Sequence, residues 1–112
     1  MRPRILCAMS TVNEVWPEHT LSGSPEAIRI VFEQMPSIMQ NVVAYAASHA
    51  DRWISYEEGD SVTGRPRGSF ARSFGGYRSK DPSRARPFHL GKDGVGLFYL
   101  LVDPEQASGI LG

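Results

Sequence analysis

The chain has 112 residues, 41% of them apolar, and its twelve basic and twelve acidic side chains leave no formal net charge. This length allows one domain with a modest core, and the two Trp, four Tyr and five Phe residues favour a folded protein over a disordered one. A single cysteine excludes an intrachain disulfide and a thiolate metal cluster, and no apolar run is long enough for a membrane span. The composition predicts a soluble protein without membrane contact.

The first elements are predicted from turn and capping residues. Residues 1–12 are expected to be a flexible leader, with Met9 as an alternative start, and residues 13–112 a single α+β domain. Residues 10–23 favour an edge strand interrupted by Pro17. Ser24-Pro25-Glu26 predicts the start of a short helix over 25–34, because the hydroxyl can cap it and proline suits the first helical position.

One apolar stripe keeps a helical period from Ala27 to Tyr56. Pro36 interrupts it and removes a helical hydrogen bond, so a long amphipathic helix is predicted over 37–56, after the short one. Its core or interface face is predicted to contain Ile38, Val42, Ala46, His49 and Trp53. His49 is interpreted as a packed or interface residue rather than a catalytic one.

The most unusual segment is 64–92, which has eight cationic side chains and one acid, Asp81. This charge density is expected to keep it out of the core as a long basic loop or hairpin, with a strand around 68–77, and with Phe70 and Phe74 as anchors. The Gly-Arg-Pro-Arg-Gly sequence at 64–68 is interpreted as a solvated loop rather than a minor-groove hook. The predicted contacts with a neighbouring subunit or DNA are Arg65, Arg67, Arg72, Arg78, Lys80, Arg84 and Arg86.

The last third predicts a hairpin and a short helical turn. Residues 88–90 and the apolar run 94–102 are expected to pair through a turn at Asp93-Gly94. Asp103-Pro104-Glu105 resembles a helix cap. The predicted fold is therefore α+β, with a short helix and a long amphipathic helix packed on a small antiparallel sheet.

No catalytic or metal-binding pattern is present. His19, His49 and His89 lack metal-ligand spacing, and Glu57-Glu58-x-Asp60 is interpreted as a solvated helix end rather than a cation site. Nucleophile elbows, phosphate loops and dinucleotide fingerprints are absent. The sequence predicts a non-enzymatic protein with no cofactor and no metal.

Three stretches resemble the head–tail joining (neck or tail-completion) proteins of tailed phages. They are Leu21-Ser22-Gly23, the helical segment from Ala27 through Met35-Pro36 into the helix from Ile38, and Thr63-Gly64 through Phe70, which looks like the start of that family's sheet. Pro66 departs from the pattern, as does the chain end at 108–112. The resemblance implies a virion structural protein, assembled in the host cytoplasm as a ring, possibly a hexamer, between portal and tail proteins, with DNA in its lumen.

The charge distribution fits such an assembly, because the acidic residues outside 64–92 and the basic ones within it could meet between copies. Two alternatives use the same arginines. One is a small nucleic-acid-binding regulatory protein, for which the basic segment 64–92 contacts phosphates. The other, less favoured, is a small toxin-like ribonuclease.

Overall fold

The computed structural model describes residues 11–81 and 84–112. Within these ranges the chain forms five α-helices, one short 3-10 helix and a four-stranded antiparallel sheet. The helices are α2 (Pro25–Glu33), α3 (Ser37–Ala47), α4 (Tyr56–Val62), α5 (Ser69–Lys80) and α6 (Pro104–Leu111), with η1 at Pro17–His19. The strands are β1 (Val12–Glu14), β2 (Ile54–Ser55), β3 (His89–Asp93) and β4 (Phe98–Leu101). The predicted α+β class is confirmed.

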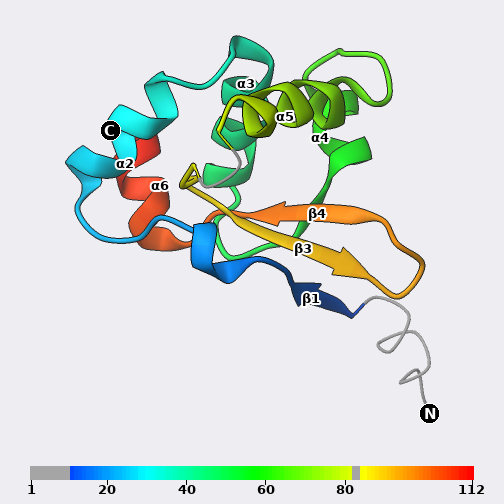
Figure 1. Ribbon diagram of the computed structural model, residues 1–112, viewed down its shortest axis with the longest axis horizontal. Helices are drawn as coiled ribbons and strands as arrows, with labels where there is room; N and C mark the ends of the chain where they lie inside the picture. The colour runs from blue at the N-terminus through cyan, green and yellow to red at the C-terminus, as the bar shows by residue number, and fades with distance from the viewer. Residues whose placement is uncertain (1–10, 82–83) are drawn as a thin grey trace.

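The sheet has the order β1-β3-β4-β2. In Figure 1, helices α3, α4 and α5 lie together on one side of the β3–β4 hairpin, and α2 and α6 lie beside each other near the end of the hairpin opposite its loop. Leu90 of β3 faces Leu100 of β4, which in turn faces Ile54 of β2. All three side chains are buried, so the middle of the sheet forms one side of the hydrophobic core.

Several predicted elements are confirmed. Ser24 caps α2 by accepting a hydrogen bond from the N–H of Ala27 at 3.2 Å, and Pro36 separates α2 from α3. Asp103 and Gln106 form a reciprocal capping box at the start of α6. The hairpin also forms, although β3 continues to Asp93 and the chain reverses over residues 94–97, after the expected turn.

The N-terminal prediction is tested only in part. Residues 1–10 of the expected leader lie outside the described residues, whereas Val12 already pairs with Asp93 as the first residue of β1. Strand β1 is an edge strand as predicted, but it is short, and Pro17 begins η1.

The predicted long helix over 37–56 is wrong, because α3 ends at Ala47. Residues 48–52 are mostly polar and exposed, and Asp51 takes a left-handed backbone conformation with φ of 66°. Its N–H donates to the carbonyl of Val102 at 2.8 Å, which turns the chain so that Ile54 can enter the sheet. The helical spacing of apolar residues continues past Ala47, but these residues lie in a loop, in β2 and at the start of α4.

The prediction that 64–92 is a basic loop or hairpin with a strand around 68–77 is also wrong. Residues 69–80 form helix α5, which places Phe70, Phe74 and Tyr77 on one buried face. With Phe88 these rings join the main core, so a segment dense in arginine contributes four aromatic residues to it. Phe70 and Phe74 anchor the segment to the core as predicted, but from a helix.

Candidate functional site

Helix α5 has two chemically distinct faces. Its inner face is fixed by aromatic packing, since the Phe70 ring lies 4.7 Å from Tyr56 and 6.2 Å from Phe88, measured between centroids. Phe74 lies 5.7 Å from Phe88 in the same cluster. This anchoring determines which side of α5 points outward.

The outer face of α5 is basic and small. Its exposed residues are Ala71, Arg72, Gly75, Gly76, Arg78, Ser79 and Lys80, and the helix contains no acid. Arg72, Arg78 and Lys80 form no ion pair with any carboxylate of residues 11–81 and 84–112. The positive charge on this face is therefore available to an external anion.

A buried carboxylate fixes the start of α5. Asp60, on α4, is 2% exposed, and its two oxygens accept hydrogen bonds from the N–H of Gly68 at 2.8 Å and of Phe70 at 2.9 Å. Gly68 has φ of 91°, a backbone conformation that favours glycine. The interpretation of this acidic cluster as a solvated helix end is wrong for Asp60, which locks α4, the turn and α5 into one unit.

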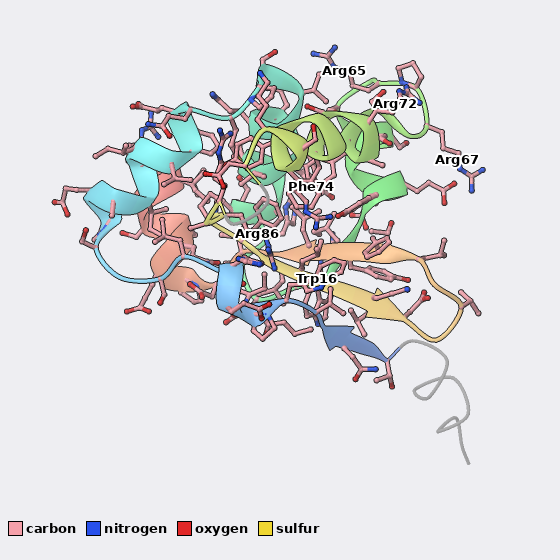
Figure 2. The ribbon with its side chains drawn as sticks, in the orientation of Figure 1. Trp16, Arg65, Arg67, Arg72, Phe74 and Arg86 are labelled. Atoms are coloured by element: carbon pink, nitrogen blue, oxygen red, sulfur yellow. The ribbon has the colours of Figure 1, made fainter. Side chains whose placement is uncertain are left out.

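The turn between α4 and α5 carries two further cations. Arg67 lies 3.7 Å from Glu57, but both side chains are more than 60% exposed, so this pair is weak. Figure 2 shows Arg67 and Arg72 on the side of the molecule where α5 starts, with Arg65 above the helix. These arginines extend the basic surface beyond the helix.

The hairpin loop is held by hydrogen bonds to Asp93 and lies beside the turn between α4 and α5. One oxygen of Asp93 accepts hydrogen bonds from the N–H groups of Val95 at 2.9 Å and Leu97 at 3.0 Å, and the other accepts one from the Tyr99 hydroxyl at 2.8 Å. Desolvation opposes ionisation of Asp93, but these hydrogen bonds outweigh it and lower its pKa. Gly96 and Leu97 line one cavity with Arg67 and Gly68, so the hairpin tip and the start of α5 are neighbours.

Arg86 differs from the other predicted contact residues. It is 3% exposed, and its guanidinium donates to the carbonyl oxygens of Val15 at 3.1 Å and Trp16 at 2.8 Å. Burial lowers its pKa. Arg86 is therefore an internal residue, and its prediction as a surface contact is corrected. Arg84 is partly exposed and covers the ring of Tyr77 at 4.4 Å.

The predicted core or interface face of the long helix is divided between two settings. Val42 and Ala46 are fully buried in α3, and Ile38 is partly buried. His49 lies beyond the end of α3 and is exposed, with its ring 4.5 Å from that of Tyr45, so its predicted packing inside the stripe is wrong. Trp53 precedes β2 and is partly buried, and a Cβ on Gly91 would lie 2.8 Å from its ring.

Within residues 11–81 and 84–112, no group of three or more His, Cys, Asp or Glu side chains could hold a metal ion. None of the helices found there is long and apolar enough to cross a membrane. Comparison of the chain with protein-family models, curated proteins and solved structures gives no match.

Proposed function

We propose that this chain binds duplex DNA through a helix-turn-helix made by α4 and α5, supported by the β3–β4 hairpin as a second contact. In such motifs the first helix crosses the DNA backbone and the second lies in the major groove. The observation that carries the proposal is the outer face of α5. It is basic and free of acid, and it is fixed in orientation by the Asp60 hydrogen bonds to Gly68 and Phe70.

The dimensions of α5 suit the major groove. Twelve residues make a helix of about 18 Å, and the groove of B-form DNA, about 12 Å wide, admits one α-helix. At about 100° per residue, Arg72 lies near the middle of the exposed face, and Arg78 and Lys80 lie toward its two edges. On this proposal the two outer cations reach phosphates on both sides of the groove. Phosphate contacts supply most of the affinity and fix the orientation of the protein.

The hairpin adds a contact next to that of the helix. Its tip shares a cavity with Arg67 and Gly68, so a groove-bound α5 brings the hairpin close to the flanking backbone. Lys92 lies over the ring of Phe98 at 5.4 Å, which holds its ammonium group on the hairpin surface. The succession of helix α3, strand β2, helices α4 and α5 and then the hairpin is similar to the order of elements in winged helix-turn-helix domains, and this similarity supports the proposal.

The phage ring-subunit function stays a prediction. Two elements that its resemblance implied have other structures, since the long helix ends at Ala47 and the Thr63–Phe70 stretch leads into α5 instead of a strand. The described residues favour the nucleic-acid-binding alternative, because the basic segment is organised as a helix with a fixed outer face. A mass measurement at micromolar concentration separates the two, since a ring subunit forms a closed oligomer.

The proposal is tested by fluorescence anisotropy with a 20-base-pair duplex between 50 and 200 mM salt. Affinity should fall with salt, and replacing both Arg72 and Arg78 by alanine should weaken binding and reduce the log–log slope by about 2, roughly 0.9 for each lost phosphate contact. Arg29→Ala is the matched control, because Arg29 lies on α2 and bonds to Glu33 and to the carbonyl of Ile110. Absence of duplex binding at 50 mM salt, or equal losses in both variants, contradicts the proposal.

A further inference from the structure

A small cavity of about 170 Å³ opens between α5 and the sheet. Its walls include the rings of Trp16, Tyr56, Phe74 and Phe98, together with Leu90 and Arg78. Cavities of about 150 Å³ can hold benzene. The site therefore has the volume for one aromatic ring and a small substituent, and its walls are themselves aromatic.

Trp16 is held in this cavity wall against its backbone preference. Its φ of 49° places it in the left-handed region, which is unusual for a bulky residue, and its side chain remains 41% exposed. The buried Arg86 fixes the Trp16 carbonyl with a 2.8 Å hydrogen bond, and the indole stacks on Phe98 with centroids 6.4 Å apart. A strained, exposed and firmly held aromatic residue is typical of a binding site.

The polar groups at the cavity are donors. The guanidinium carbon of Arg78 lies 5.0 Å from the centre of the Trp16 ring and 5.8 Å from that of Phe74. Arg78 and the Tyr56 hydroxyl form no side-chain hydrogen bond with another described residue. Behind the wall, the Nε of Arg86 is buried without a hydrogen-bond partner, and Arg86 forms no ion pair within the described ranges. Glu14 and Glu18 interact with Arg86 only at longer range, and no carboxylate of residues 11–81 and 84–112 forms an ion pair with Arg78.

We propose that this cavity binds a small aromatic anion, with its ring against Trp16 and Phe98 and its carboxylate on Arg78. The aromatic walls select a flat ring through stacking, and the guanidinium selects an anion through charge-assisted hydrogen bonds. Burial raises the pKa of Tyr56, another residue of the cavity wall, so that it adds no negative charge to the site. A ligand of this class matches both the apolar lining and the unpaired charge.

The site is coupled to the outer face of α5. Ala71, Gly75 and Arg78 of that helix line the cavity, so a bound anion contacts the proposed DNA-binding element directly. On the proposed function, an anion that engages Arg78 competes with phosphate for the same guanidinium. Anion binding itself does not depend on DNA binding, so the two can fail separately.

Isothermal titration of the full chain with benzoate tests the proposal, with benzamide as a ring without charge and acetate as a charge without a ring. Benzoate should bind saturably, and at least about tenfold more tightly than either probe. Benzamide lacks the charge-assisted hydrogen bond, which is worth about that factor, and acetate lacks the apolar ring that the cavity buries. Arg78→Gln should weaken benzoate binding about tenfold. Arg72→Gln, on the same helix but outside this cavity, should not.

The location is checked by NMR, where benzoate should shift the indole N–H signal of Trp16 and not that of Trp53, with Trp16→Phe providing the assignment. Three results overturn the inference: no saturable benzoate binding, equal binding of benzoate and benzamide, or equal losses in Arg78→Gln and Arg72→Gln. Duplex binding by the same preparations is measured separately. DNA binding without benzoate binding would retain the proposed function and remove this site.

Discussion

Helices α3 and α5 pack against each other, but they differ in their exposed faces. Of the two, only α5 exposes charged side chains and glycines. Helix α3 has eleven residues, no charged side chain and five buried positions. Helix α5 has twelve residues, three cations and two central glycines, and buries four positions. One face of each helix satisfies the core. The outer face of α5 therefore needs an explanation from outside the described chain, whereas that of α3 does not.

The glycines make this difference sharper. A Cβ on Gly59 of α4 would lie 2.6 Å from Cγ1 of Val42, and one on Gly109 of α6 would lie 2.7 Å from the carbonyl oxygen of Pro25. Both positions need glycine because two segments pack closely. At Gly75 and Gly76 a Cβ would meet nothing within 4 Å. Close approach by a partner such as DNA would supply the missing reason.

The largest effect is expected from breaking the link between α4 and α5. Asp60→Ala removes two hydrogen bonds to a buried carboxylate, each worth about 1.5 kcal/mol or more, so the unfolding free energy should fall by about 3 kcal/mol. The loss should also loosen the start of α5 and weaken duplex binding. Urea denaturation and anisotropy on the same preparation measure the two effects.

Glu57→Ala is the matched control for Asp60→Ala, since both carboxylates lie on α4. Glu57 is exposed and its pair with Arg67 spans 3.7 Å, so its replacement should change the unfolding free energy by less than about 0.5 kcal/mol. Similar losses in the two variants would show that the Asp60 hydrogen bonds do not fix α5.

Replacing the two glycines tests whether the outer face of α5 serves a partner. Gly75→Ala and Gly76→Ala should each raise the unfolding free energy by about 0.5 to 1 kcal/mol, because alanine is the better helix former and nothing obstructs it. Both should weaken DNA binding if the helix backbone lies close to the duplex. In each variant the melting temperature should then rise, while the duplex affinity measured by anisotropy falls.

Gly59→Ala provides the contrast, since its Cβ would collide with the buried Val42 and should destabilise the fold. Unchanged duplex affinity in stabilised Gly75→Ala and Gly76→Ala variants would mean that the partner does not approach the helix backbone. The basic side chains would then carry the contact alone.

The sequence predicted the elements that depend on local signals. The Ser24-Pro25 cap, the interruption at Pro36 and the Asp103 cap each depend on a few adjacent residues, and each is confirmed. The end of α3 was missed because the apolar phase continues beyond it, and the reversal depends on a tertiary hydrogen bond from Asp51 to Val102. Helix α5 was missed because its charge and glycines outweighed the i, i+4, i+7 spacing of Phe70, Phe74 and Tyr77.

The sequence indicates which segment carries the candidate site, but not which of its side chains are exposed and which are buried. Arg72 and Arg86 are equivalent in composition, yet one is exposed and the other is 3% exposed with carbonyl partners from residues 15 and 16. Such partners are seventy positions away, and no local pattern identifies them. The same holds for Asp60, whose role depends on the path of the chain through Gly68.

The smallest expected effect is a pH dependence of stability that comes from the sheet and α6. His89 lies between Glu14 and Asp103, with 2.8 Å from each ring nitrogen to a carboxylate oxygen. Burial opposes protonation of the ring, but the hydrogen bonds to Asp103 and Glu14 outweigh it and raise the pKa of His89. Burial likewise opposes ionisation of Asp103, but the hydrogen bonds from His89 and Gln106 prevail and lower its pKa.

Because the pKa of His89 is raised on folding, the protonated ring contributes fully to the free energy of unfolding below its pKa in the unfolded chain, about 6.5. That contribution is lost as the pH rises through the pKa of His89 in the folded protein. Because the pKa of Asp103 is lowered on folding, its carboxylate contributes fully to the free energy of unfolding above its pKa in the unfolded chain, about 3.9. That contribution is lost as the pH falls through the pKa of Asp103 in the folded protein. Urea denaturation should therefore show lower stability at pH 8 than at pH 5.5, and His89→Gln should reduce that difference. Because His89 lies on β3 and not on α5, the salt dependence of duplex binding should be the same in this variant. A changed log–log slope of affinity against salt would mean that β3 and α5 do not act independently. Residues that stabilise the fold would then also affect the DNA contacts of α5.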